Sequence, residues 1–556
     1  MTKVSSPQAS SARHDQTFPV FRPFEIDRLR PFGTVVRFRD GERVLRAGEK
    51  SPGLFVILEG CATIAVKNIF GHVTPIAEYG PGGFIGETGN LSGRTALVDG
   101  YAEGDTVALL LEPDRLRSLL IADAEIGERI MRALILRRVN LIEGATVGPT
   151  IVGSENDAGV IRLQGFFRRN GHPFVIIDPV KDADAAELFA RAGTSLASLP
   201  LVVLADGSIL QNPNVEQVAA SLGMSSEPSR NHYDVAVVGA GPAGLSTAVY
   251  AASEGLTVAV CDARSFGGQA GASARIENYF GFPTGISGFA LTARAYSQAQ
   301  KFGAEMMIPT GIESLDCTKP GGYFVLNTRE GHVVRARSVV IASGAYYRRP
   351  DIDGLKDLEG RGIWYWASPI EARLCKDQDV YVVGGGNSAG QAVIYLSSHA
   401  RSVQMLVRGE GLAASMSSYL INRIQSAPNV TVHYHTEIDA FQSDGSGLTG
   451  LSLVDRRTGK KSHAETRNLF LFIGADPATE WLSGCGVSLD RANFVSTGGS
   501  VLPPASNELE TSVPGVFAIG DVRSGSTKRV GAAIGEGAQV VAALHRFLSL
   551  TPLPAA

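Results

Sequence analysis

The stretch Tyr233-Asp-Val-Ala-Val-Val238, followed by Gly239-Ala240-Gly241-Pro242-Ala243-Gly244, decides the fold of the larger part of this chain. A strand of the buried type runs into a glycine-rich loop and then into an alanine-rich helix. The glycines allow a tight turn, the approach of a pyrophosphate to backbone N–H groups, and close packing of helix on strand. The next strand, Thr257–Cys261, ends in Asp262, where an acid accepts hydrogen bonds from ribose hydroxyls. The stretch therefore predicts a dinucleotide site rather than an ordinary turn.

A second signal of the same kind lies about 145 residues further on. The strand Val380–Val383 runs into Gly384-Gly385-Gly386-Asn387-Ser388-Ala389 and a helix. Its following strand, Val403–Val407, ends in Arg408, a cation that suits a 2′-phosphate and favours NADPH. Glu410 could instead serve a free ribose, which leaves NADH open. Two Rossmann-type α/β units are expected.

Two further strand ends complete the pattern. The strand Val516–Ile519 is followed by Gly520-Asp521-Val522, which places a carboxylate over a bound sugar chain. The strand Ser338–Ile341 is followed by Ala342-Ser343-Gly344-Ala345, the predicted crossover turn between the two units. Together with the two glycine loops, these segments predict a flavoprotein with FAD in one unit and NAD(P)H in the other.

Composition excludes several other classes of protein. The 556 residues suggest three or four domains, and a formal net charge of −4 without a block of like charges gives no reason to invoke nucleic acid. No apolar run of about 18 residues is present to span a membrane, and the N-terminus lacks the apolar core of a signal peptide. The five cysteines are more than 50 residues apart, with no CxxC, which favours a reducing, cytoplasmic compartment over a disulfide framework.

Changes of pattern along the chain predict the domain boundaries. We expect a disordered polar tail over residues 1–22, and a linker at 225–232. The predicted domains are a β-barrel with helices at 23–147, an α/β domain at 148–224, an FAD unit at 233–349 and 474–556, and an NAD(P)H unit at 350–473.

Residues 233–550 resemble the low-molecular-weight bacterial thioredoxin reductases. The resemblance is carried by Gly239–Gly244, Phe266-Gly267-Gly268-Gln269, Ile276-Glu277-Asn278-Tyr279, Gly384–Ala389 and Gly520-Asp521-Val522. It implies FAD contacts at Gly241, Asp262, Gly268, Gln269, Asn278 and Asp521, and near Arg529 and Val530 beside the flavin ring. It also implies a homodimer and an NADPH unit that rotates to bring the nicotinamide to the flavin.

The chain departs from this family where the family keeps its dithiol. The two cysteines of the family's CxxC fall on Ala367 and Ile370, and the relay of electrons to a protein disulfide needs both thiols. Cys375, five residues later, is expected to be a buried small hydrophobe. Of the family's three arginines for the 2′-phosphate only Arg408 remains. We therefore expect an oxidoreductase whose catalytic group is the flavin itself, and which passes electrons directly to an unknown acceptor.

The two N-terminal domains carry resemblances of their own. Phe84-Ile85-Gly86-Glu87 and Arg94 resemble the phosphate-binding cassette of cyclic-nucleotide-binding domains, shortened by about two residues, so that Glu87 would hold the ribose and Arg94 the cyclic phosphate. Docking or dimerisation is the alternative use of this barrel. Residues 148–224 resemble a thioredoxin or glutaredoxin fold, with Leu199-Pro200 fitting its cis-proline. The redox CxxC is missing there, which favours docking or scaffolding.

Two rival functions remain open. The protein could be a flavin- or nucleotide-based redox sensor with little turnover, in which a ligand at Arg94 gates the flavin unit. It could also be a relative of the peroxiredoxin reductases, although both of their dithiols would be missing.

Overall fold

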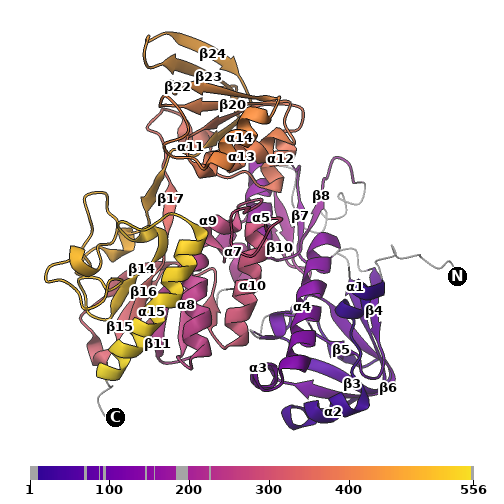
Figure 1. Cartoon of the computed structure of the whole chain (residues 1–556). Helices are drawn as coiled ribbons and strands as arrows, with labels where there is room; N and C mark the ends of the chain where they lie inside the picture. Colours follow the sequence, from indigo (N-terminus) through magenta and orange to yellow (C-terminus); the bar gives the residue numbers. More distant parts are fainter. Residues whose placement is uncertain are drawn as a thin grey trace. The chain divides into compact units, whose positions relative to one another are not determined.

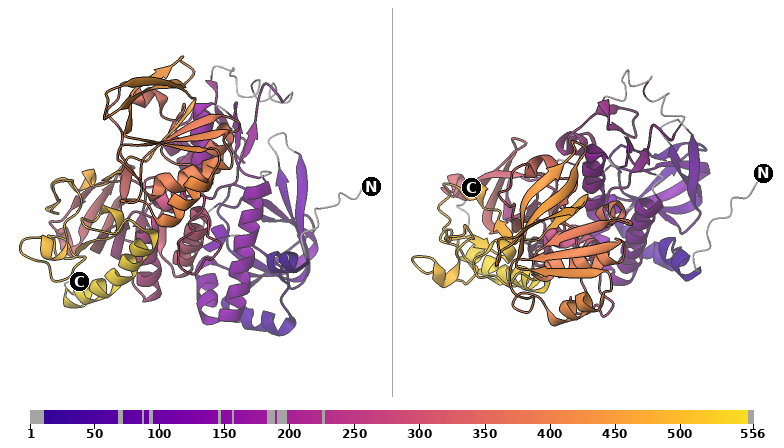
Figure 2. Two further views of the ribbon diagram at one scale, coloured as in Figure 1. Left: turned by 45° about the horizontal axis from the view of Figure 1, so that its top comes forward. Right: turned by 90° about the horizontal axis from the view of Figure 1, so that it is seen from above.

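The computed structural model describes residues 11–551 apart from 68–71, 87, 92–94, 145–146, 156, 183–188, 190–197 and 225–226. The domains follow one another along the chain as coloured in Figure 1, and Figure 2 gives two further views. None of the described helices is long and apolar enough to cross a membrane.

The first domain is an antiparallel β-structure followed by helices. Its strands are β1 (Thr34–Phe38), β2 (Arg43–Leu45), β3 (Leu54–Lys67), β4 (Val73–Tyr79), β5 (Phe84–Ile85) and β6 (Asp99–Leu111). They pair in the order β1-β6-β3-β4, with β2 on β6 and β5 on β3. The strand-like segments 54–58 and 62–66 are joined in the single strand β3, because Gly60 takes a φ of +80° and bulges within it instead of ending it.

The helices of this domain correct one prediction and agree with another. The tail predicted to be disordered through residue 22 contains α1 (Ser11–Thr17), and Phe21 just beyond is buried in the core. The helices predicted to follow the barrel are α3 (Pro113–Ala122) and α4 (Ala124–Gly144). They break at Asp123, whose carboxylate accepts a hydrogen bond from the Ile126 N–H (3.1 Å) at the start of α4.

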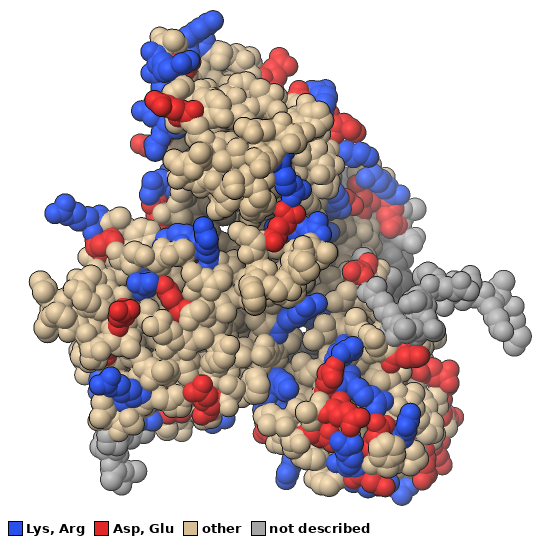
Figure 3. All heavy atoms as spheres, in the orientation of Figure 1, with Lys and Arg blue, Asp and Glu red and all other residues tan. Residues whose placement is uncertain are grey.

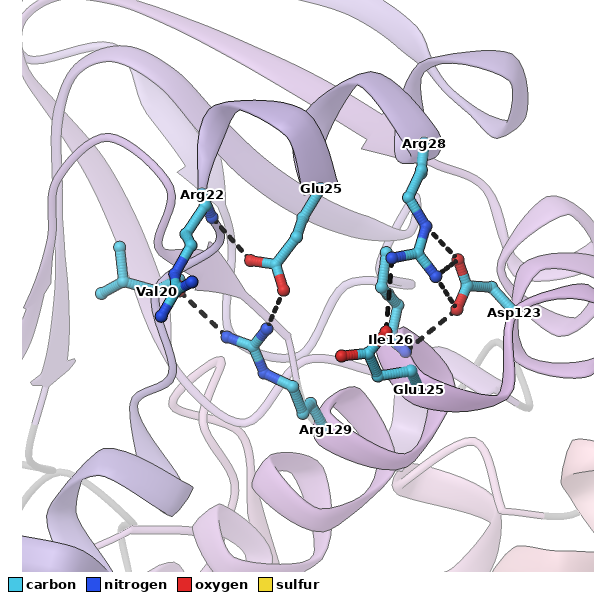
Figure 4. A network of polar contacts seen from close by, with 8 residues as sticks. All are labelled: Val20, Arg22, Glu25, Arg28, Asp123, Glu125, Ile126 and Arg129. Carbon is cyan, nitrogen blue, oxygen red and sulfur yellow. Dashed lines mark hydrogen bonds and ion pairs between the residues drawn. The ribbon is translucent and has the colours of Figure 1, made fainter.

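An ion-pair network joins α2 (Pro23–Leu29) to Asp123 and the first turns of α4, as Figure 4 shows. The Arg28 guanidinium donates to both carboxylate oxygens of Asp123 (2.9 and 2.8 Å). Glu25 is buried and pairs with Arg129 of α4, and it also accepts a hydrogen bond from the Arg22 N–H (2.7 Å). Acidic and basic side chains are interspersed over the surface seen in Figure 3.

The second domain has a small mixed sheet. Its elements are β7 (Thr150–Val152), α5 (Ala158–Arg169), β8 (Val175–Ile177), β9 (Leu201–Val203), β10 (Ile209–Gln211) and α7 (Val215–Ser221). The strand order is β10-β9-β7-β8, with β7 and β8 parallel and the other pairs antiparallel. The Leu199–Pro200 peptide bond is cis. The segment 183–197 lies almost wholly outside the described residues, and the assignment to a thioredoxin-like fold stays a prediction.

Residues 233–344 and 478–551, here called the flanking half, form a seven-stranded sheet and its helices. The elements are β11 (Tyr233–Val238), α8 (Pro242–Ser253), β12 (Val258–Cys261), α9 (Gly268–Gly271), α10 (Gly288–Lys301), β13 (Glu305–Met307), β14 (Ile312–Asp316), β15 (Phe324–Thr328), β16 (Val333–Ile341), β27 (Val516–Ala518) and α15 (Val530–Leu550). The order is β13-β12-β11-β16-β15-β14, and β27 also pairs with β16. The parallel strands β11, β16 and β27 end in register at Val238, Ile341 and Ala518, so the loops that follow them leave one edge together.

Residues 345–477, here called the inserted half, have a second parallel sheet and a β-meander. The elements are β17 (Ala345–Tyr347), α11 (Leu355–Leu358), β18 (Ile363–Trp364), α12 (Pro369–Leu374), β19 (Asp379–Val383), α13 (Asn387–Ser397), β20 (Ser402–Val407), α14 (Ser418–Ser426), β21 (Val430–Tyr434), β22 (Thr436–Ser443), β23 (Leu448–Asp455), β24 (Lys461–Glu465), β25 (Asn468–Leu471) and β26 (Ala475–Pro477). The parallel order is β18-β25-β19-β20-β21. The chain enters through β17 and leaves through β26, which pair antiparallel.

Helix α15 lies directly on α8. A Cβ at Gly537 would lie 2.4 Å from the Ala243 carbonyl oxygen and 2.8 Å from the Ser246 Cβ. The Ser246 hydroxyl donates to the Ile534 carbonyl (2.8 Å), which fixes the two helices against each other. This close approach keeps the start of α15 beside the glycine loop.

We predict opposite effects for alanine at two glycines of α15. Gly537→Ala should lower the free energy of unfolding by about 1–3 kcal/mol, because the new methyl group overpacks the contact with α8. Gly535 is exposed with no atom near its added Cβ, so Gly535→Ala should leave stability unchanged or raise it by up to about 1 kcal/mol through helix propensity. Thermal melts followed by circular dichroism compare the two, and equal melting temperatures would contradict the packing argument.

Candidate functional site

The predicted dinucleotide residues of the flanking half gather where β11, β16 and β27 end. The Gly267 N–H donates to the Ala240 carbonyl (2.7 Å), which joins the loop after β11 to the segment that precedes α9. Gly520 approaches the same loop from β27, since a Cβ there would lie 3.0 Å from that of Ala243. Three segments far apart in the sequence therefore meet at one edge of the sheet.

The loop after β11 is a cradle that side chains would fill. A Cβ at Gly239, where φ is +113°, would lie 2.2 Å from the Ala342 carbonyl oxygen, and one at Gly244 would lie 1.9 Å from the Gly239 carbonyl oxygen. Gly268, at φ +54°, would bring a Cβ to 3.0 Å from the Gly241 Cα. At these three glycines backbone packs directly on backbone, which is the close approach that a pyrophosphate-binding loop requires, and the residues present fit FAD.

Asp262 fastens the cradle to the end of β12. Its carboxylate accepts hydrogen bonds from the N–H groups of Ala240 (2.9 Å), Arg264 (2.9 Å) and Ser265 (3.2 Å). Burial raises the pKa of Asp262 above its ordinary value, and these N–H groups act in the opposite direction. Oδ1 accepts the bonds from Arg264 and Ser265, and Oδ2 accepts that from Ala240, so Oδ2 is the oxygen that could accept a second donor such as a ribose hydroxyl.

A second carboxylate stands at the end of β27. Burial raises the pKa of Asp521, while the charge of Lys528 opposes that shift. The Lys528 ammonium also donates to the Asp521 carbonyl and to the Ser526 hydroxyl (2.8 Å). Arg529, the exposed N-cap residue of α15, and Val530, its first residue, follow directly, so the helix begins beside this site.

The remaining predicted FAD residues lie on neighbouring loops. The Gln269 side-chain amide donates to the Ala345 carbonyl, immediately after Gly344. Asn278 is exposed on the loop that follows the bridge between Ile276 and Ile286. The structure thus ties Gln269 to the crossover turn, whereas Asn278 is exposed.

The second glycine loop joins β19 to α13 in the inserted half. A Cβ at Gly384, where φ is +139°, would lie 2.4 Å from the Phe472 carbonyl oxygen, and Gly386 is the N-cap residue of α13. The Asn387 side chain accepts a hydrogen bond from the Ser417 N–H (2.7 Å), and Ser388 and Ala389 continue the helix. Arg408 is exposed directly after β20, whose Leu406 pairs with Val383, so its cation reaches the edge at which the loop opens.

Packed apolar groups stand at the two positions where the resemblance places the cysteines of the family's dithiol. Ala367 and Ile370 are both buried at the start of α12. Ser368 and Glu371 form the capping box of that helix, and the Trp366 indole N–H donates to the buried Glu371 carboxylate (3.0 Å). Glu371 is not among the predicted functional residues, although the spacing Ser-x-x-Glu before an apolar segment is the signature of a capping box.

Cys375 does not replace the dithiol. It is fully buried, and burial raises the pKa of its thiol to about 12. A thiol in this state is neither a nucleophile nor a relay group at neutral pH, so the prediction of a buried small hydrophobe fits.

The first domain has a cavity beside the predicted cassette. Its volume is about 380 Å³, and its lining includes Arg43, Arg46, Glu49, Lys50, Ser51 and Ala96. Glu87 and Arg94 lie outside the described residues. The cassette is held from both sides, because the buried Asn90 amide donates to the Ser51 hydroxyl (2.9 Å) and the Arg137 guanidinium donates to the carbonyls of Phe84 (2.9 Å) and Gly86 (3.2 Å).

Comparison with known families agrees with this geometry. Residues 233–537 match the model of the family described as pyridine nucleotide-disulphide oxidoreductase. The chain belongs to this family. Residues 35–123 match the cyclic nucleotide-binding domain, which confirms the fold class predicted for the first domain.

Individual members of the pyridine nucleotide-disulphide oxidoreductase family are similar over the same region. NADPH-dependent thioredoxin reductase 3 of Arabidopsis thaliana is 35% identical over 341 residues, which are 60% of this chain and 62% of that protein. Thioredoxin reductase of Streptomyces clavuligerus is 32% identical over 57% of this chain and 94% of its own length. The crystal structure of T. acidophilum thioredoxin reductase superposes with a TM-score of 0.53 at 29% identity, covering 57% of this chain and 99% of that one.

Membership confirms the predicted two-Rossmann architecture and its cofactors. Proteins of this kind use FAD and NAD(P)H, so this chain is an FAD-dependent NAD(P)H oxidoreductase. The assignment of single residues to each cofactor remains a prediction from the motifs.

The hydrogen bonds of Asp262 lead to a prediction about FAD. Asp262→Ala should weaken FAD binding about 10- to 100-fold, because a charge-assisted acceptor and the fastening of the cradle are lost together. Asp444→Ala is the matched control, since that exposed carboxylate also accepts from a backbone N–H (Ser446, 3.0 Å) but belongs to a hairpin of the inserted half. Titration of the apoprotein with FAD, followed by flavin fluorescence, measures both; an unchanged affinity in Asp262→Ala would contradict the assignment.

Proposed function

We propose that this oxidoreductase passes electrons from NAD(P)H through FAD directly to its acceptor, without a dithiol relay. The observation that carries the proposal is the buried apolar pair Ala367 and Ile370 at the positions where the resemblance places the two thiols. Cys375 is the one cysteine between residues 350 and 473, and its raised pKa keeps it protonated. Exchange with a protein disulfide needs a thiolate and a resolving partner, and this segment offers neither.

The chain's own part in the reaction is to bind, orient and exclude water. The cradle at Gly239–Gly244 and Gly268 would hold the FAD pyrophosphate on backbone N–H groups, while Asp262 and Asp521 would orient its sugar chain. The loop Gly384–Ala389 would hold the nicotinamide dinucleotide, with Arg408 facing a 2′-phosphate. When bound, FAD supplies the two-electron exchange with the nicotinamide.

Without a dithiol relay, the electron acceptor belongs to a class that reacts directly with the flavin. A group that takes electrons directly from a flavin is a quinone, dioxygen, an iron–sulfur protein or a small disulfide, and each must reach the ring itself. We infer a homodimer in a cytoplasmic setting, as the family resemblance and the cysteine pattern imply. The thioredoxin-like second domain would serve docking rather than redox chemistry, since it lacks a CxxC.

A second candidate function is supported by the first domain. The cavity of about 380 Å³ beside the cassette is lined by Arg43, Arg46 and Lys50 and by one acid, Glu49, which pairs with Arg46 (2.8 Å). The excess of cationic side chains suits an anionic ligand such as a cyclic nucleotide. Arg137 of α4 is hydrogen-bonded to the cassette, so a ligand that moves Phe84–Gly86 would also shift this helix. We infer that a cyclic nucleotide regulates the flavin unit, or that the protein acts as a ligand-gated redox sensor.

An anaerobic titration tests the electron transfer. NADPH, and then NADH, should bleach the visible flavin band, and the better donor shows whether Arg408 suffices for the 2′-phosphate. The reduced protein should be reoxidised rapidly by a quinone or by dioxygen, and not by oxidised thioredoxin. Multiple turnover of a thioredoxin disulfide by the purified chain would overturn the proposal.

Substitution of Arg94 tests the ligand. The full chain should bind a cyclic nucleotide, and Arg94→Ala should weaken that binding at least about 10-fold, because a charge-assisted phosphate contact is removed. Isothermal titration with cyclic AMP and cyclic GMP measures both proteins, and Arg39→Ala, on an exposed turn, is the control. Equal responses of the wild type and Arg94→Ala to both nucleotides would exclude ligand gating through this residue.

A further inference from the structure

Three strands of the first domain bring a thiol and two carboxylates together. Cys61 lies on β3, Glu78 on β4 and Glu103 on β6, at successive separations of 17 and 25 residues along the chain. The Cys61 Sγ and one oxygen of each carboxylate all lie within 4.8 Å of one another. Separations of this length match no metal-binding sequence motif, so only the pairing of the strands reveals the group.

The register of the strands explains why these side chains share one face of the sheet. Cys61 lies opposite Glu103 on β6, and Thr63, two residues further along β3, lies opposite Glu78 on β4. Residues two apart on a strand point to the same side of a sheet. Ala62, between them, is buried in the core on the other side, so the four polar side chains lie on the outer face.

Hydrogen bonds hold the side chains close to one another. The Cys61 thiol donates to the Glu78 carboxylate, with 3.2 Å between Sγ and Oε1. The Thr63 hydroxyl donates to the Glu103 carboxylate. Cys61 is half-buried, whereas both glutamates are exposed, so an ion from solvent reaches the sulfur past the two carboxylates.

The two carboxylates bring like charges together without a cation to balance them. Within the described part of the chain, neither Glu78 nor Glu103 forms an ion pair. The Arg43 guanidinium of β2 instead donates to the hydroxyl of Tyr101 (3.2 Å), which lies opposite Thr63 on β6. Like charges held close across paired strands destabilise a sheet, and a bound divalent cation would neutralise them.

We propose that Cys61, Glu78 and Glu103 bind a zinc ion, with water as the fourth ligand. Bonds of about 2.3 Å to sulfur and about 2.0–2.2 Å to oxygen place two ligands of a tetrahedral zinc ion about 3.3–3.7 Å apart. The Cys61–Glu78 separation of 3.2 Å is already close to that spacing. Zinc takes the place of the thiol proton, which passes to solvent, because the thiolate is the form that binds metal.

The sulfur decides which metal the group selects. Calcium and magnesium are bound by oxygen ligands alone, whereas a thiolate favours zinc. The bound ion would join β4, β3 and β6 on the outer face of the domain and stabilise their pairing. This role does not depend on the proposed electron transfer or on a cyclic nucleotide, because none of the three residues belongs to the predicted cofactor or cassette residues.

The test measures metal binding by the full-length flavoprotein after a chelator has been applied and removed. Isothermal titration should show one zinc ion bound per chain. In the same protein, zinc should slow the alkylation of Cys61 by iodoacetamide at least about 10-fold, because a metal-bound thiolate is a poor nucleophile, whereas calcium and magnesium should not. Peptide mapping locates the label, and Cys317, which is also half-buried, is the internal control whose labelling should not change.

Substitutions separate a metal site from an exposed acidic face. Cys61→Ser and Glu103→Gln should each weaken zinc binding at least about 10-fold, and Thr63→Val about 10-fold, because Glu103 then loses the hydrogen bond that orients it. Glu128→Gln, which removes an exposed carboxylate of α4 in the same domain, should bind zinc as the wild type does. Unchanged affinity in Cys61→Ser, or equal protection of Cys61 by calcium, would overturn the proposal. The protection measured in the wild type stands even if a variant fails to fold.

Discussion

The close contact between the glycine loop and the backbone around it is the constraint on which the rest of the flanking half depends. At Gly239 and Gly244 the polypeptide passes so near to other carbonyl oxygens that a methyl group has no place. That approach lets α8 begin directly at the end of β11, lets β16 and β27 deliver their loops to the same edge, and brings α15 onto α8 at Gly537. The dinucleotide cradle is the space that these contacts leave.

The start of α12 is stable without cysteines at Ala367 and Ile370. It is stabilised by its own capping box, in which Glu371 accepts from the Ser368 N–H (2.9 Å) and from the Trp366 indole. Ile370 is buried beside it. Because capping and apolar packing hold this helix, its stability does not depend on a pair of thiols.

Much of this arrangement could be predicted from the sequence, because the decisive signals are local. The strand, glycine loop and helix at 233–253 and at 379–397 carry their own periodicity, and the structure has them where the pattern puts them. What failed depended on distant contacts. The polar composition before residue 22 suggested disorder, yet Phe18 and Phe21 find apolar partners in the barrel. The boundary between α3 and α4 at Asp123 likewise depends on a distant contact, because an ion pair to Arg28 holds the carboxylate that also caps α4.

The pairing of β17 with β26 has a consequence for the evolution of the chain. Tyr347 lies opposite Ala475, so the two ends of the inserted half are neighbours on paired strands. The 127 residues between them form a closed loop, and the pairing of the two short strands offsets the entropic cost of closing it. A segment joined in this way behaves as an exchangeable module. A different nucleotide-binding domain could be joined to the β17–β26 pair, or a tight turn could connect the two strands directly. In both cases the sheet of the flanking half would keep all of its own strand pairings.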